Sequence, residues 1–193
     1  MIARERDEAA RAAWRAEWAG RDPAGLVFLD ETSTPTTLTS RYARAPRGDR
    51  VVGRVPRGRW EAITLIATLT PAGMGPSLVL PGALDRDAFE AYVARVLVPA
   101  LRPGQTVVLD NLSVHTSAAA RRAIEAAGCE LRFLPTYAPD LTPIEQAFAK
   151  LKGRLRRVEA RTFPAVADEI GVAYPGVTAQ DCRGFYRDAG YNL

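Results

Sequence analysis

The chain of 193 residues has the size of one ordinary domain and is long enough to bury a sizeable core. Its 47% hydrophobic and 25% charged residues are typical of a globular protein and exclude a disordered chain. No apolar run approaches the roughly 20 residues of a membrane span, and the N-terminal stretch has no apolar signal-peptide core, so we expect no membrane partner. Cys129 and Cys182 lack metal-ligand spacing and are interpreted as buried thiols in a reducing cytoplasm.

The net charge of +4 is modest, but the basic residues are concentrated in two stretches. Residues 41–59 contain seven arginines and a single acid, and residues 150–161 contain six basic residues and a single acid. Such clusters are typical of a surface that binds a polyanion. The alternative is an ordinary solvated face, so the charge pattern by itself favours a nucleic acid partner only weakly.

Apolar periodicity and turn residues predict an alternation of strands and helices. Strands are expected over residues 26–32, 60–70, 77–82, 106–111 and 129–135, with a loop or irregular hairpin over 41–59. Helices are expected over residues 3–19, 87–101, 116–128, 142–158, 162–174 and 178–191. This order predicts an α/β fold with a mixed five-stranded sheet, helices on both faces, and the strands LVFLD and VVLD parallel and central. The layout is that of a ribonuclease-H-like fold, although other α/β sheets share it.

Two aspartates directly follow the two central strands. Asp30 comes after LVFL, and Asp110 comes after VVL. Ligands of open α/β sheets bind at the carboxyl ends of neighbouring central strands, so these carboxylates should converge if the strands are adjacent. Converging carboxylates repel unless a cation lies between them, and hard oxygen ligands suit Mg²⁺ or Mn²⁺. The alternative is that each aspartate ends its strand as a turn former.

A third acid, Glu145, lies in the segment DLTPIEQAFAKLK. Thr142, Pro143 and Glu145 have the spacing of a helix start, in which Thr142 is the N-cap and Glu145 bonds back to its N–H. The apolar stripe of this helix passes about 40–60° from Glu145, which places the carboxylate at the margin of the buried face. Glu145 is therefore also placed to bind a metal together with the two aspartates, and local sequence leaves both roles open.

The only histidine, His115, follows Asp110 closely. A triad of Ser113, His115 and Asp110 is implausible, because neighbours on one short segment cannot line up as nucleophile, base and orienting group. His115 is expected either to contact substrate near Asp110 or to lie in a loop beside the helix cap at Thr116 or Ser117. The sequence has no glycine-rich phosphate loop, Cys/His metal cluster or GxSxG elbow.

The segments FLDET, VVLDNLSVH and LPTYAPDLTPIEQAFAKLK together resemble the catalytic core of a DDE transposase of the mariner-like superfamily, in its bacterial insertion-sequence branch. The resemblance covers residues 26 to 157, and CRGFYRDAGY resembles the end of the family's chain. It implies a ribonuclease-H-like fold on which Asp30, Asp110 and Glu145 are the catalytic, metal-binding residues.

The activity that the resemblance implies is metal-dependent cleavage and strand transfer of DNA at transposon ends. Two ions of Mg²⁺ or Mn²⁺ are expected, with Asp30 bridging both and Asp110 and Glu145 each holding one. The implied partners are double-stranded DNA, at terminal inverted repeats and at the target, and a second copy of the chain in a homodimer on DNA. The expected place of action is the cytoplasm, at the nucleoid.

Both basic stretches are expected to bind the DNA backbone, which makes binding salt-dependent. The expected DNA contacts are Arg41, Arg44, Arg47, Arg50, Arg54, Arg57, Arg59, His115, Lys150, Lys152 and Arg156.

We expect an N-terminal helix and linker over residues 1–24, a catalytic domain over 25–160 and a helical extension of that domain over 161–193. Family members recognise DNA ends through helix-turn-helix domains ahead of the core, so a truncated frame or a separate helix-turn-helix partner is expected. One alternative is a catalytically silent DNA-binding or assembly subunit that joins its partner through Trp14 and Trp18; these tryptophans otherwise pack on the domain's own core. Another alternative is a ribonuclease-H-like nuclease acting on hybrids or junctions.

Overall fold

The computed structural model describes residues 6–40, 42–53 and 55–193 and contains one mixed sheet. Its strands are β1 (Leu26–Pro35), β2 (Ala62–Thr70), β3 (Gly73–Pro81), β4 (Thr106–Leu109) and β5 (Glu130–Phe133). The order across the sheet is β3-β2-β1-β4-β5, in which β1 is antiparallel to β2 and parallel to β4. The prediction of a mixed five-stranded sheet with LVFLD and VVLD as parallel neighbours is therefore confirmed.

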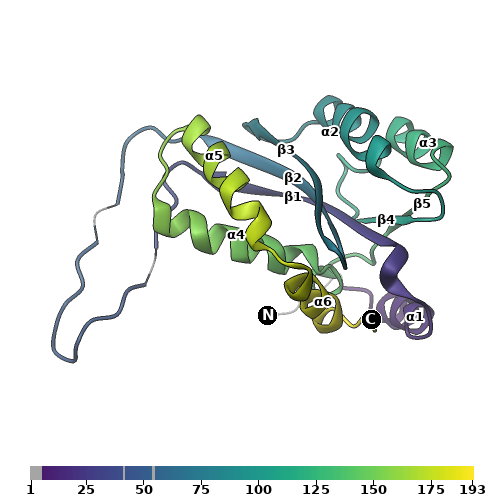
Figure 1. Cartoon of the computed structure of the whole chain (residues 1–193), viewed down its shortest axis with the longest axis horizontal. Helices are drawn as coiled ribbons and strands as arrows, with labels where there is room; N and C mark the ends of the chain where they lie inside the picture. Colours follow the sequence, from purple (N-terminus) through teal and green to yellow (C-terminus); the bar gives the residue numbers. More distant parts are fainter. Residues whose placement is uncertain (1–5, 41, 54) are drawn as a thin grey trace.

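Helices cover both faces of this sheet (Figure 1). They are α1 (Glu8–Trp18), α2 (Arg86–Tyr92), α3 (Ala118–Ala126), α4 (Ile144–Val158), α5 (Phe163–Ala173) and α6 (Ala179–Asp188). One hydrophobic core lies between the sheet and α2 with α3, and the other lies between the sheet and α1, α4, α5 and α6. None of the described helices is long and apolar enough to cross a membrane.

The helix predicted over residues 87–101 is shorter than expected. It is α-helical only to Tyr92 and continues as a π-helical turn (Val93–Leu97) and a 3₁₀ turn (Val98–Ala100). Pro99 explains the change, because proline has no N–H to donate and its ring clashes with the carbonyl four residues earlier.

Strand β1 presents its side chains alternately to the two cores. Phe28 is buried on the α4 side, and Leu29 is buried on the α2–α3 side. The same alternation places Asp30 on the α4 side and the next residue, Glu31, on the α2–α3 side. Adjacent acids in the sequence thus serve opposite faces of the sheet.

Strand β4 brings its aspartate to the same place as that of β1. Val108 pairs with Phe28 in the parallel ladder and is buried in the same core. Two residues further along, Asp110 follows the end of β4 and Asp30 lies just beyond the part of β1 that pairs with β4, both on the same face. Because β1 continues to Pro35, Asp30 lies inside this strand and not after its end as predicted. The α4 helix packs over this face. An acid at the start of α4 can therefore lie near the two aspartates that the strand register brings together.

Helix α1 packs on the domain's own core. Trp14 and Trp18 are 5% and 6% exposed, and the Trp14 indole N–H donates to the Tyr191 hydroxyl at 2.9 Å. That hydroxyl in turn donates to the Leu141 carbonyl at 2.8 Å. The two tryptophans are therefore not available as a face for a partner subunit.

Helix α1 also holds the turn that precedes α4. The Arg11 guanidinium is 1% exposed and donates to both carboxylate oxygens of Asp140, at 2.9 and 2.5 Å. Such bidentate pairs have strong directional preferences. The start of α4 is thus fixed by residues more than a hundred positions away in the sequence.

The arginine-rich stretch is a long loop that extends away from the body of the protein (Figure 1). Its described residues between 42 and 60 contain no helix or strand, and all are exposed. Arg161 holds the base of the loop by donating to the Leu38 carbonyl at 2.8 Å. Because no core packing restrains its tip, the charge of this loop is available to a partner.

Candidate active site

A cavity of about 390 Å³ opens between the middle of β1, the carboxyl end of β4 and the first turn of α4. The carboxylates of Asp30, Asp110 and Glu145 line it. The rest of the lining comes from the loops that follow β4 and β5 and consists of Asn111, Leu112, Leu134, Pro135, Thr136, Tyr137, Ala138, Pro139 and Thr142. Three acids from three separate elements therefore share one cavity.

The start of α4 differs from the predicted capping box. A 3₁₀ turn (Pro139–Leu141) precedes the helix, and the Thr142 N–H donates to the Pro139 carbonyl at 3.2 Å. Pro143 takes the N-cap position, and no side chain caps this helix. The capping-box alternative, with Thr142 as N-cap and Glu145 as its partner, is thus wrong, because the 3₁₀ turn already bonds the Thr142 N–H. Glu145 is also more exposed than its predicted place at the margin of the core.

Negative charge accumulates around Asp30. Burial raises the pKa of Asp30 to about 8, and the charges of Glu31, Asp110 and Glu145 act in the same direction, against a backbone hydrogen bond that lowers the pKa. None of the cavity-lining residues that the structure describes is a lysine or arginine. The cavity therefore favours a cation.

Each aspartate keeps one carboxylate oxygen free for such a cation. Asp30 Oδ1 accepts from the Glu31 N–H at 2.8 Å, and Asp110 Oδ1 accepts from the Leu112 N–H at 3.1 Å and contacts His115. No described residue donates to the Oδ2 atom of either aspartate or to the Glu145 carboxylate. This donor set fits Mg²⁺ or Mn²⁺, which prefer hard oxygen ligands.

The three acids do not form a finished metal site as they stand. Within the described part of the chain, no group of three or more histidine, cysteine, aspartate or glutamate side chains is arranged to hold one ion. A bound metal therefore requires a side-chain movement, which the exposed and unbonded Glu145 is free to make.

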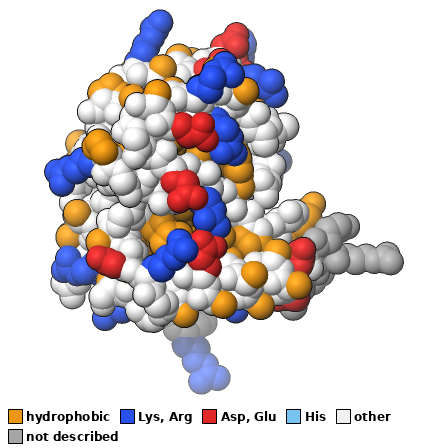
Figure 2. Space-filling model, turned by 90° about the vertical axis from the view of Figure 1, so that its right-hand side faces the viewer, with side chains coloured by type: hydrophobic (Ala, Val, Ile, Leu, Met, Phe, Trp, Pro, Cys, Tyr) orange, Lys and Arg blue, Asp and Glu red, His pale blue; other side chains and the backbone are white. Residues whose placement is uncertain are grey.

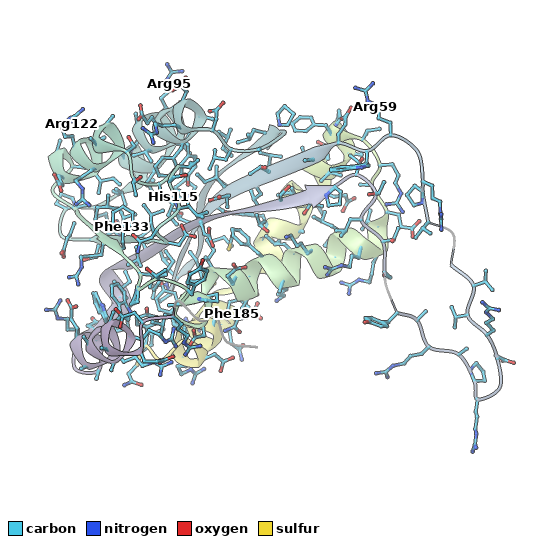
Figure 3. The ribbon with its side chains drawn as sticks, turned by 180° about the vertical axis from the view of Figure 1, so that it is seen from behind. Arg59, Arg95, His115, Arg122, Phe133 and Phe185 are labelled. Carbon is cyan, nitrogen blue, oxygen red and sulfur yellow. The ribbon has the colours of Figure 1, made fainter. Side chains whose placement is uncertain are left out.

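His115 lies behind the cavity, not on its surface. The ring is fully buried against Phe89, with Nδ1 2.5 Å from Asp110 Oδ1 and Nε2 2.7 Å from Glu31 Oε2. Figure 3 shows it in the interior, while Arg95 and Arg122 point outward from the helices beside it. The expectation that His115 contacts DNA is therefore wrong, because Asp110 and the buried core enclose it.

The position of His115 also determines its charge. Burial lowers the pKa of His115, but the hydrogen bonds and charges of Asp110 and Glu31 outweigh this effect and raise the pKa to about 10. The ring is then an imidazolium at neutral pH and donates from both nitrogens. It fixes Asp110 Oδ1 and leaves Oδ2 directed away from the bridge.

Glu31 is a site residue that the sequence analysis missed. It accepts from His115, 84 positions along the chain, and reaches it because β1 turns Glu31 to the opposite face from Asp30. The available signal was the dipeptide of Asp30 and Glu31 in a strand whose successive side chains point to opposite faces of the sheet.

The predicted DNA contacts have different environments. Arg44, Arg47, Arg50, Arg57 and Arg59 are exposed on the long loop, whereas Arg41 and Arg54 lie outside the described residues. Lys150 forms an ion pair with Asp181 at 2.6 Å. Lys152 is half-buried, and burial lowers its pKa, whereas Arg156 is partly exposed. The loop therefore offers more available charge than the α4 flank.

The opposite side of the molecule has a mixed charge pattern. Figure 2 views the side that carries α1 and α3 and shows acidic and basic side chains next to one another. Ion pairs at this side include those of Arg132 with Glu17 at 2.8 Å and Arg21 with Glu17 at 3.1 Å. Paired charges of this kind provide no uniform positive field for a polyanion.

Comparisons with known proteins show which family the chain belongs to. A family model described as DDE superfamily endonuclease matches residues 25–167. The Tcb1 transposase of Caenorhabditis briggsae is 27% identical over 165 residues, covering 78% of this chain and 60% of that protein. The chain thus spans about 60% of the length of this curated relative.

Solved structures share the fold. A Mos1 transposase paired-end complex with the left transposon end has a TM-score of 0.78 at 17% identity, over 98% of this chain and 62% of that one. The Mos1 transposase catalytic domain solved with raltegravir and Mn has a TM-score of 0.69 at 14% identity, over 95% of this chain and 90% of that one. The fold is therefore the ribonuclease-H-like fold of those catalytic domains, and with the family match over most of its length the chain belongs to the DDE superfamily endonucleases.

Proposed function

We propose that the chain is the catalytic domain of a transposase that cuts DNA strands at transposon ends and joins them to target DNA. The observation that carries this proposal is the cavity in which Asp30, Asp110 and Glu145 meet in a chain of the DDE endonuclease family. Solved relatives support it, because Mos1 transposase structures include a paired-end complex with the left transposon end and paired-end complexes with Mn and with Mg.

Two divalent ions bound here would activate the attacking oxygen and stabilise the leaving oxygen of a phosphodiester. Asp30, at the centre of the three acids, is the residue proposed to bridge both ions. Asp110 and Glu145 would each hold one of them. His115 keeps Asp110 oriented, and no covalent protein intermediate is required.

The long arginine loop is proposed to bind the DNA backbone. Its described arginines are exposed, and their contacts with phosphates would make affinity fall as salt rises. We propose a catalytic domain over residues 25–160, preceded by an N-terminal helix and linker over residues 1–24 and followed by a helical extension of the same domain over residues 161–193. A homodimer on DNA, a separate helix-turn-helix partner, membership of the bacterial insertion-sequence branch and action at the nucleoid belong to the same proposal.

A cleavage assay tests this function. Wild-type protein is mixed with supercoiled plasmid DNA, and nicking is followed with and without Mn²⁺. We expect metal-dependent nicking that Asp110→Asn reduces by at least about a hundredfold, because a lost metal ligand removes several kcal/mol of transition-state stabilisation. Asp87→Asn is the matched control, since Asp87 is an exposed aspartate in the first turn of α2.

Three outcomes contradict the proposal in different ways. Nicking that survives Asp110→Asn would exclude the assigned site. Salt-sensitive DNA binding without any nicking would favour the silent DNA-binding subunit. Faster cutting of RNA–DNA hybrids than of duplex DNA would favour the ribonuclease-H-like nuclease.

A further inference from the structure

The cavity has a second wall that the carboxylates do not explain. Besides the acids, its lining is largely apolar, with Leu112, Leu134, Pro135, Tyr137, Ala138 and Pro139. Two of these side chains are large and open to solvent, since Leu112 is 48% exposed and Tyr137 is 55% exposed. Its volume of about 390 Å³ is in the range of cavities that admit small organic groups.

Tyr137 is held at this wall in an unusual backbone conformation. Its φ is +53°, in the left-handed region that side chains other than glycine rarely adopt. The other described non-glycine residue with positive φ, Glu159, ends α4, where that conformation is common. Tyr137 has no such helix end to explain it, and backbone strain of this kind clusters at functional sites.

The loop that carries Tyr137 is anchored on both sides of the cavity. The Leu134 N–H continues the β4–β5 ladder by donating to the Leu109 carbonyl at 2.8 Å. The Asn111 side chain, next to Asp110, donates to the Leu134 carbonyl at 2.8 Å. These bonds tie the start of the loop after β5, three residues before Tyr137, to the segment that carries Asp110.

We propose that this wall is a nucleobase subsite, in which the base of a nucleotide beside the scissile phosphate unstacks and packs on the Tyr137 ring next to Leu112. This subsite rests on the proposed function and identifies the base beside the scissile phosphate as the part of the DNA that contacts this wall. Because the acids and the apolar residues line one cavity, a phosphate held near the carboxylates would bring the base of an adjacent nucleotide near Tyr137. Every base has a π-face, so such a contact positions the strand without reading its sequence.

Abasic substitution tests the subsite. Duplex DNA that the wild type cuts with Mn²⁺ is prepared with one abasic nucleotide at a time around the cut, and single-turnover rates are measured. We expect one abasic position to slow the wild type roughly five- to a hundredfold, the range for loss of one stacked base. Tyr137→Ala should slow cutting of intact DNA by a similar factor, and placing the abasic nucleotide at that position should slow this variant little further. Tyr137→Phe should keep the wild-type rates on both intact and abasic DNA.

A structural role for Tyr137 is separated by Tyr137→Gly. Glycine adopts positive φ without strain, so the melting temperature should be unchanged or higher while cutting is slowed as in Tyr137→Ala. Wild-type rates in Tyr137→Ala, or abasic penalties equal in the variant and the wild type, would overturn the subsite and leave the proposed function intact. A wild type that cuts no DNA with Mn²⁺ overturns both.

Discussion

Replacing Asp30 by asparagine is expected to abolish metal-dependent cleavage and, in metal-free protein, to make the fold more stable. The carboxylate lies where Glu31, Asp110 and Glu145 add their negative charge, and burial raises its pKa to about 8. Asparagine has nearly the same shape without the charge, so it removes both the metal ligand and the repulsion. If the Asp30 charge is retained for catalysis at a cost in stability, Asp30→Asn should gain stability and lose activity.

The raised pKa of Asp30 determines how the stability of the fold changes with pH. Between the ordinary pKa of an aspartate, 3.8, and about 8, the folded protein holds the Asp30 proton more tightly than the unfolded chain, so stability falls as pH rises through this window. One pKa unit corresponds to about 1.4 kcal/mol. Because solvent reaches the partly buried Asp30 and screens its charge, we expect less than the full effect, and Asp30→Asn should raise the free energy of unfolding at about pH 8 by roughly 2 kcal/mol. Urea unfolding at several pH values measures it, with Asp87→Asn as control. A variant that keeps the wild-type pH profile, or that still cuts DNA, contradicts the assignment.

Removing the His115 bridge is expected to weaken both activity and stability. His115→Ala leaves Asp110 and Glu31 facing each other without the imidazolium between them. Groups that orient a metal ligand typically contribute ten- to a hundredfold to metal affinity or activity, so we expect a loss of that order in cleavage and Mn²⁺ binding. We also expect roughly 1–3 kcal/mol less stability, because a buried charged partner is lost.

The pH dependence of stability and two further variants of His115 test whether its hydrogen bonds to Asp110 and Glu31 have this role. The folded-state pKa near 10 lies above the ordinary value of 6.5, so the stability from His115 is full below about pH 6.5 and is lost as pH rises towards 10. His115→Asn places an amide donor near the former Nδ1 and should keep more activity than His115→Gln, whose amide lies nearer the former Nε2. Equal Mn²⁺ affinity in His115→Ala and wild type would show that the bridge does not position Asp110.

The central aspartates were predictable because their positions follow from local pattern. Short apolar runs identified β1 and β4, and an acid directly follows each run. Asp110 lies at the carboxyl end of β4, whereas β1 continues past Asp30 in its pairing with β2. The parallel register then brought Asp30 and Asp110 to one face. The role of Glu145 was not predictable from local pattern alone. The helix period placed it near the core margin, where the structure leaves it exposed, and the family resemblance supplied its role.

The supporting residues were not predictable from local sequence. Glu31 meets His115 across 84 positions, and Arg11 meets Asp140 across 129, so both contacts depend on how helices and strands pack. The positive φ of Tyr137 likewise comes from the anchored loop around it and not from tyrosine's own preference. The capping prediction at Thr142 failed because a preceding 3₁₀ turn, invisible in the helix pattern, had already bonded that N–H.

A crystal structure with Mn²⁺, located by its anomalous scattering, tests the assigned metal centre most directly. We expect two Mn²⁺ ions in the cavity, with carboxylate oxygens of Asp30, Asp110 and Glu145 as ligands and the Glu145 side chain turned inward. Mn²⁺ bound to the two aspartates while Glu145 stays directed to solvent or bonds to backbone would contradict the role of the third acid. A cavity without Mn²⁺ at concentrations that support cleavage would contradict the site as a whole.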